Sequence, residues 1–189
     1  MTTEVPISSA SKRPHKSRRL ENGSIMAEVV KVMQERVPAL RFIGKRYTDA
    51  DAPFGRKWGE WFREDRFGTL EALGPAPEHE GAYIGLMRSA GDFEYWIGMF
   101  FPVGTPAPEG YDFVDLPACT FATCWLYGRE DTGELFGDAA QKLCFSQIAK
   151  EGWKVAETPW VMERYNCPRY TDPDEHGKVI LDYLIQLAG

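Results

Sequence analysis

Beyond residue 24, short runs of apolar and polar positions predict strands and helices in a recurring order. In the first half, the runs 28–34 and 40–44 predict two strands separated by Pro38. Aromatic residues at helical spacing over 54–65 then predict a helix, and the proline just before it suits a helix start. The runs 81–87 and 93–101, joined by a short turn, predict a β-hairpin.

The second half repeats this order of elements. The pattern predicts a strand over 119–127, a helix over 133–152, and two strands over 160–165 and 179–187. A proline-rich link, 102–117, joins the halves. Two β-α-β-β units of this size are each too small to bury both faces of a sheet, so we expect them to pair around a pseudo-two-fold axis. The expected fold class is α+β: a curved antiparallel sheet with both helices on one face, and a ligand groove on the opposite face or at the seam between the halves.

The chain divides into a predicted leader and one folded domain. Residues 1–24 are rich in Ser, Thr, Lys and Arg without apolar periodicity, which predicts a disordered basic leader. The domain is expected over 25–189, with one repeat at about 26–103 and the other at about 117–187. The formal net charge is −6 for the whole chain, and −10 once the first 20 residues are left out. A domain with this excess of acidic residues suits neutral or cationic ligands better than nucleic acid.

Composition excludes several classes of protein. Aromatic residues make up 13% of the chain, enough for a large core and a ring-lined site. No apolar run is long enough to cross a bilayer and no secretory signal is present, so we expect a cytoplasmic protein without a membrane partner. The cysteines and histidines lack zinc-ligand spacing, and phosphate-loop, dinucleotide and serine-hydrolase motifs are absent, so we expect no metal and no cofactor.

Glu163 is the most informative single residue. It shares one face of its predicted strand with Val161 and Tyr165. A carboxylate among apolar and aromatic neighbours must either reach water, with Arg164 or Lys178 as an ion-pair partner, or occupy a pocket that awaits a ligand. The spacing alone does not choose between these two interpretations.

A second cluster surrounds Tyr95 and Trp96. Strand alternation places Tyr95 on one face and Glu94, Trp96, Gly98 and Phe100 on the other. Gly98 and Gly85 leave room above the sheet, either for a flat ligand or for a large side chain from a covering helix. Of the two tryptophans on the first helix, Trp58 and Trp61, at least one is expected in the core.

Four short motifs carry a resemblance to a known family: Tyr83-Ile-Gly-Leu86, Phe93-Glu-Tyr-Trp-Ile-Gly98, Met162-Glu-Arg-Tyr165 and Leu181-Asp-Tyr-Leu-Ile185. In this order they resemble the GyrI-like small-molecule-binding family, the effector-binding domain of AraC-type and MerR-type multidrug-sensing regulators. The resemblance covers about residues 26–187. Gln186 departs from the proline that family members often have there. Since residues 1–24 cannot form a helix-turn-helix, we expect a stand-alone member without direct binding of nucleic acid.

The resemblance implies a groove between the halves that is lined by rings and has a glutamate at its floor. Glu163 matches that glutamate, and Tyr95 and Trp96 match the family's aromatic pair. The expected ligand-binding residues are Glu163, Tyr95, Trp96, Phe100, Trp61, Tyr83, Trp125 and Tyr165. The expected function is binding of a small cationic or planar hydrophobic organic molecule.

Two other functions are left open by the same resemblance. Some stand-alone members hydrolyse strained electrophilic molecules, in which case Glu163 acts as general base and Tyr95 or Tyr165 as proton donor. A gyrase-interacting protein is the third alternative. The expected partner is therefore a small-molecule ligand, and a homodimer is left open.

Overall fold

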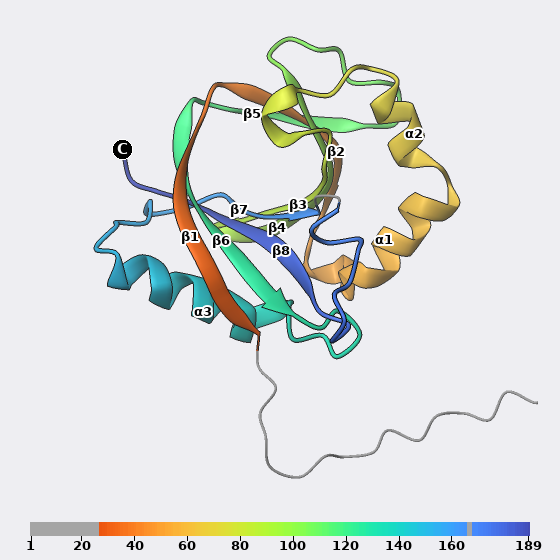
Figure 1. Cartoon of the computed structure of the whole chain (residues 1–189). Helices are drawn as coiled ribbons and strands as arrows, with labels where there is room; N and C mark the ends of the chain where they lie inside the picture. The colour runs from red at the N-terminus through yellow and green to blue at the C-terminus, as the bar shows by residue number, and fades with distance from the viewer. Residues whose placement is uncertain (1–26, 166–167) are drawn as a thin grey trace, which may run out of the picture.

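The computed structural model describes residues 27–165 and 168–189, so the predicted basic leader lies outside the described residues. Within this part, eight strands form one antiparallel sheet that three α-helices accompany (Figure 1). The strands are β1 (Glu28–Val37), β2 (Leu40–Tyr47), β3 (Tyr83–Ala90), β4 (Asp92–Pro102), β5 (Asp112–Leu116), β6 (Cys119–Gly128), β7 (Val161–Tyr165) and β8 (Val179–Gln186). The helices are α1 (Phe54–Arg63), α2 (Arg66–Glu71) and α3 (Gly137–Lys150), with 3₁₀ turns at Asp49–Asp51 and Pro77–His79.

The sheet order shows the predicted duplication. The strands follow one another as β1-β6-β8-β7-β3-β4-β2-β5. The two repeats are β2-α1-β3-β4 and β6-α3-β7-β8, and they meet at the central β3–β7 pair. From this pair outward, the strands of the first repeat follow in the order β3, β4, β2, and those of the second repeat in the matching order β7, β8, β6. Each half then ends on a strand taken from the other part of the chain. Thus β1 precedes β2 in sequence but pairs with β6, and β5 precedes β6 but pairs with β2.

Two elements depart from the sequence-based prediction. β5 lies inside the proline-rich link, to which no strand was assigned from the sequence. The predicted helix over 54–65 corresponds to α1, and α2 was not predicted; Asp65, whose backbone is left-handed (φ 51°), separates the two. The prolines at 102, 106 and 108 all precede β5, so its five residues are free to pair with β2.

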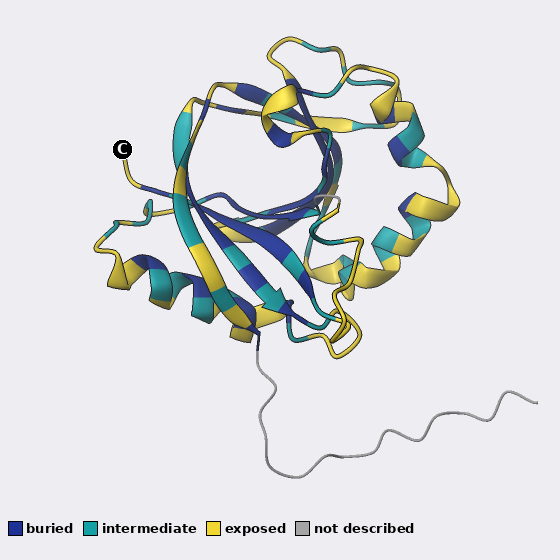
Figure 2. Cartoon of the chain, in the orientation of Figure 1, coloured by how far each residue is buried: buried dark blue, intermediate teal, exposed yellow. Residues whose placement is uncertain are grey.

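Both predicted helices cover the same face of the sheet, as expected. One apolar cluster joins α3 to β6, β7 and β8, and another joins α1 and α2 to β2 and β4. The buried side of each helix turns toward the strands and the exposed side toward solvent (Figure 2). We call this the helix face.

The opposite face curves inward and is filled by side chains. We call it the inner face. Its cluster takes residues from every strand of the sheet, among them Phe42, Trp96, Phe121 and Met162. A packed core therefore occupies much of the face that was one of the two places expected for a groove. The seam between β3 and β7 remains.

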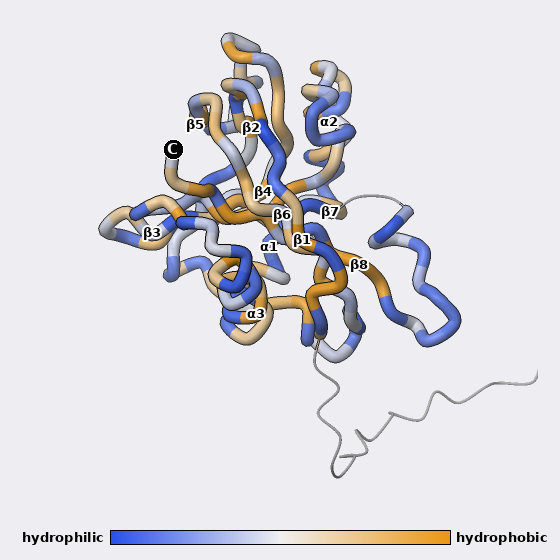
Figure 3. The backbone as a smooth tube through the Cα atoms, turned by 60° about the vertical axis from the view of Figure 1, so that its left-hand side comes forward, coloured by the Kyte–Doolittle hydropathy of each residue, from blue (hydrophilic) through white to orange (hydrophobic). Residues whose placement is uncertain are grey.

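The strands of the sheet are more hydrophobic than the loops that connect them. Figure 3 shows β8 as a hydrophobic segment and the loop before it as hydrophilic. Among the described helices, none combines the length and the apolar character that a membrane span requires. In the same part of the chain, no group of three or more His, Cys, Asp or Glu side chains is arranged to hold a metal ion.

Candidate functional site

Glu163 lies on the helix face at the seam between the two halves. On β7 it stands in register with Gly85 of β3 and with Tyr183 of β8. Gly85 is required by this geometry: a Cβ atom there would lie 2.5 Å from Tyr95 Oη and 3.0 Å from Glu163 Oε2. The space above Gly85 is therefore taken by the tyrosine hydroxyl and the carboxylate, which approach the backbone more closely than any side chain would allow.

Two tyrosine hydroxyls donate to the Glu163 carboxylate. Tyr165 Oη donates to Oε2 at 3.0 Å, and Tyr95 Oη donates to the same oxygen at 3.3 Å. The indole Nε1 of Trp58, on α1, donates to Tyr95 Oη at 2.9 Å. The tyrosine of the first half and the glutamate of the second are thus joined across the seam, and α1 holds the tyrosine in place.

Burial dominates the electrostatics of this site. Glu163 is 7% exposed, and burial raises its pKa to about 7, although the hydrogen bonds from Tyr165 and Tyr95 oppose the rise. Burial, together with the nearby carboxylate, holds the pKa of both tyrosines well above the usual value of a phenol. Among residues 27–165 and 168–189, no lysine, arginine or histidine pairs with Glu163. A carboxylate held in this way is uncompensated at neutral pH.

Aromatic rings enclose the carboxylate. Phe54 stacks on Tyr95 with ring centroids 4.3 Å apart, and Trp58 meets Tyr165 edge-on at 4.8 Å. Tyr170 also meets the Tyr165 ring edge-on, with centroids 4.9 Å apart. Of these rings, only Tyr95 and Tyr165 are among the site residues expected from the sequence. Trp58 follows Phe54 by four residues on one helix, and that spacing could have placed both above the same strands.

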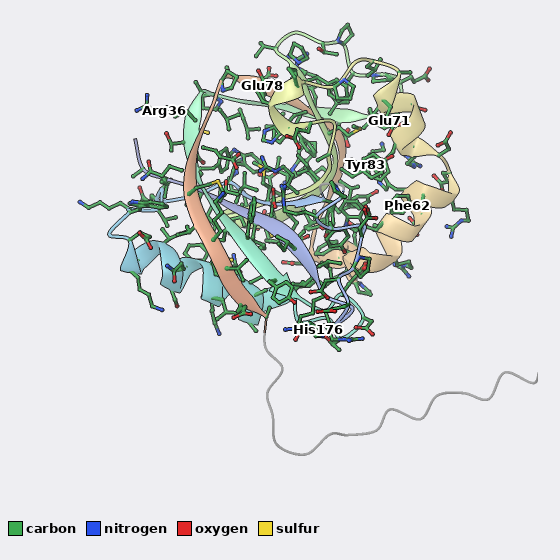
Figure 4. All side chains as sticks on the ribbon, viewed as in Figure 1. Arg36, Phe62, Glu71, Glu78, Tyr83 and His176 are labelled. Atoms are coloured by element: carbon green, nitrogen blue, oxygen red, sulfur yellow. The ribbon has the colours of Figure 1, made fainter. Side chains whose placement is uncertain are left out.

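Tyr83 and Trp61 lie on the helix face but in the neighbouring core. The Tyr83 ring stacks on Phe67 with centroids 3.8 Å apart, and its hydroxyl donates to Glu71 at 2.7 Å, beside α1 and α2 (Figure 4). Trp61 is fully buried and donates to the hydroxyl of Tyr47 at 2.9 Å. Trp61 is thus the tryptophan of α1 that belongs to the core, and Trp58 is the one beside the glutamate.

The other three expected residues lie on the inner face and do not meet Glu163. Phe100 packs against Phe42 at 5.0 Å between ring centroids, and the Trp96 indole donates to Glu94 at 2.9 Å. Trp125 is in register with Asp182 and lies under the side chains of Lys31 and Arg169. The sheet separates these rings from the carboxylate, because neighbouring residues of a strand point to opposite faces. The structure therefore does not bring the eight expected residues into one groove.

Glu94 provides an instructive contrast. It is as buried as Glu163, at 7% exposed, but it accepts hydrogen bonds from Arg88, Arg46 and Trp96. Burial alone would raise its pKa, but these hydrogen bonds and the charge of Arg88 lower it below the usual value. Two buried glutamates of one sheet thus have opposite electrostatics, and Glu163 is the one whose charge is not matched.

Two surface hollows lie away from Glu163. One, of about 400 Å³, is bordered by Arg46, Thr48 and Phe93. The other, of about 260 Å³, is bordered by Trp125, Arg164 and Arg169 on the inner-face side. Arg164 is itself held by Glu35 and Asp182 at 2.9 Å each. In this structure the rings close over Glu163, and Trp58 and Tyr165 beside it are half-buried.

Similarity to known proteins is found at the level of the fold. No protein-family model and no curated protein matches the sequence. Among solved structures, SAV2435 bound to tetraphenylphosphonium is similar with a TM-score of 0.65 at 14% identity, over 85% of this chain and 95% of that one. The C-terminal domain of EcmrR is similar with a TM-score of 0.50 at 11% identity, over 84% and 97% of the two chains.

EcmrR in a complex with DNA is also similar, with a TM-score of 0.53 at 14% identity. That match covers 83% of this chain but only 57% of EcmrR. At these identities the likeness concerns the fold. The chain therefore has the fold of the GyrI-like effector-binding domains that its sequence motifs resemble.

Proposed function

We propose that this domain binds a small organic cation at Glu163, on the helix face at the seam between the halves. The observation that carries the proposal is the buried Glu163 carboxylate, which has two tyrosine hydroxyls as partners and no cation among the described residues. A ligand that supplies the missing positive charge relieves a cost that the empty domain bears at neutral pH.

The surrounding rings suit the same class of ligand. Aromatic faces attract cations, by about 0.5–2 kcal/mol for each contact. Tyr165, Trp58 and Tyr170 are close to the carboxylate and only partly buried, whereas Tyr95 lies beneath them. A cation approaching beside Trp58 and Tyr165 thus meets rings first and the charge afterwards. The binding of tetraphenylphosphonium by SAV2435, which shares the fold, supports this choice of ligand.

Removing the charge of Glu163 is expected to weaken cation binding about tenfold or more. A pair of unit charges about 4 Å apart contributes up to about 4 kcal/mol at an effective dielectric constant near 20, and each factor of ten in affinity corresponds to about 1.4 kcal/mol. The measurement is a titration of tryptophan fluorescence with tetraphenylphosphonium at pH 8, for the wild type and Glu163→Gln. Trp58 lies within the site and reports the contact.

Glu94→Gln is the matched control for that titration. Glu94 is equally buried but lies on the inner face with its own arginines, so this variant is expected to keep the wild-type affinity. Equal affinities for the wild type and Glu163→Gln would remove Glu163 from the site and contradict the proposal.

Hydrolysis of a strained electrophile is the second candidate function. It is favoured by a specific observation: a glutamate with a pKa near 7 and a tyrosine hydroxyl 3.0 Å away form a general base beside a proton donor. Glu163 would take a proton from water, whose oxygen attacks the electrophilic carbon. The bond from that carbon to the ring heteroatom breaks, and the heteroatom takes a proton from Tyr165, which Glu163 then restores.

Turnover separates this candidate from simple binding. For an enzyme, product from an epoxide or aziridine accumulates beyond one equivalent per protein, and Glu163→Gln abolishes that accumulation while the variant still binds ligand. The measurement is product formation followed by chromatography at pH 7.5. Absence of product across a panel of such electrophiles, with cation binding intact, would leave binding as the function.

A further inference from the structure

The two oxygens of the Glu163 carboxylate are not equivalent. Tyr165 and Tyr95 both donate to Oε2, at 3.0 and 3.3 Å. Oε1 receives no hydrogen bond from any residue in the described part of the chain. An ionised carboxylate has about four acceptor positions, and no described residue occupies those of Oε1.

The two tyrosine hydroxyls near Oε1 already donate their hydrogens to Oε2. Tyr95 Oη uses its hydrogen on Glu163 and accepts the indole N–H of Trp58, while Tyr165 Oη uses its hydrogen on Glu163. The remaining neighbours offer ring faces and edges, from Phe54, Trp58 and Tyr170. A ligand thus meets one carboxylate oxygen that can accept a charged N–H, inside walls that suit hydrocarbon groups.

From this arrangement we infer that the site, if it binds cations as proposed above, selects tertiary ammonium ions, whose single N–H donates to Glu163 Oε1. A quaternary ammonium ion brings the same charge but has no hydrogen to donate. A primary ammonium ion brings three N–H groups, of which Oε1 accepts one, and the others lose their water against the rings. The tertiary ion matches both the oxygen and the walls.

The hydrophobic effect predicts a different order, and this makes the inference testable. Each additional buried methyl group adds apolar area that favours binding, so burial alone favours the quaternary ion over the tertiary one. A charge-assisted hydrogen bond contributes more than a neutral one and is lost in the quaternary ion. Tighter binding of the tertiary ion therefore reports the N–H contact and not the hydrocarbon area.

The experiment compares three probes that share one benzyl group: benzyltrimethylammonium, protonated N,N-dimethylbenzylamine and protonated benzylamine. Affinities are measured by calorimetry at pH 8, with the whole chain. We expect the tertiary ion to bind about tenfold more tightly than either of the others. In Glu163→Gln all three are expected to weaken, and the gap between the tertiary and quaternary ions is expected to shrink.

Tyr165→Phe provides an independent reading. The variant keeps the ring that contacts Trp58 and Tyr170 but takes one donor away from Oε2, which leaves a second oxygen able to accept. The primary ion is then expected to gain on the tertiary ion by several-fold. A primary ion that gains nothing would contradict the assignment of the N–H to the carboxylate.

The outcomes of the two proposals are distinguishable. Binding of the quaternary ion as tightly as the tertiary one, with Glu163→Gln weakening both, would overturn the inference and leave the cation site standing. If none of the three probes and no tetraphenylphosphonium binds, the proposed function itself is wrong, and the inference falls with it.

Discussion

Glu163→Gln is expected to stabilise the ligand-free protein by about 3 kcal/mol at pH 8, and to bring no gain near pH 4. The pKa of Glu163 is raised from 4.5 to about 7 in the folded protein, so the folded state holds its proton more tightly than the unfolded state. The stability that this proton contributes is fully present below pH 4.5 and is lost as the pH rises to about 7. Each unit of difference corresponds to about 1.4 kcal/mol.

Glutamine cannot ionise, so the variant does not lose this stability. The measurement is unfolding by urea at pH 5, 6, 7 and 8 for both proteins, with the difference expected to grow over this range. Glu94→Gln is the control of opposite sign: the pKa of Glu94 is lowered, so its charge stabilises the fold at neutral pH and its removal costs stability there. If Glu163→Gln destabilises the empty protein at pH 8, the residue is part of a structural ion pair and the proposed site is wrong.

The affinity for tetraphenylphosphonium is expected to fall about tenfold between pH 8 and pH 6. This probe carries a fixed charge and does not titrate, so the change comes from the protein. With a pKa of about 7, Glu163 is mostly charged at pH 8 and about one-tenth charged at pH 6, and the cation binds the charged form. His79, which is buried with a pKa lowered to about 4, stays neutral throughout this range.

The same titration in Glu163→Gln is expected to be weak and independent of pH between 6 and 8. The measurement is fluorescence or calorimetric titration at matched ionic strength, because salt screens charge interactions. A flat profile for the wild type would mean that Glu163 does not change its charge on binding, and would count against an uncompensated carboxylate in the site.

Much of this fold could be predicted from the sequence because its strands alternate cleanly between two faces. The order strand–helix–strand–strand was recovered twice, as was the covering of one face by both helices. β5 was missed because prolines and glycines surround it and two of its five residues are aspartates, which are uncommon in strands. The exchange of β1 and β5 between the halves could not be predicted, because local periodicity carries no information about which strands pair.

The site was predicted in part. Strand spacing brought Glu163 and Tyr165 to one face, and the structure joins Tyr95 to them through Oε2. The family's aromatic pair, Tyr95 and Trp96, consists of adjacent residues on one strand, which must point to opposite faces. That alternation was visible in the sequence and argued against including Trp96 and Phe100. Trp58 could not be chosen over Trp61, because only tertiary packing decides which turn of α1 lies above the seam.

The exchanged outer strands have a consequence for how the chain can be divided. Tyr95 comes from one half and Glu163 from the other, and they meet where β3 and β7 pair over only five residues. At the two edges of the sheet, β1 pairs with β6 of the second repeat, and β5 pairs with β2 of the first repeat. A fragment ending in the proline-rich link would keep β1 without its partner and half of the tyrosine–glutamate contact. Neither repeat alone therefore contains both residues of the tyrosine–glutamate contact, and the contact needs strands from both halves of the sheet.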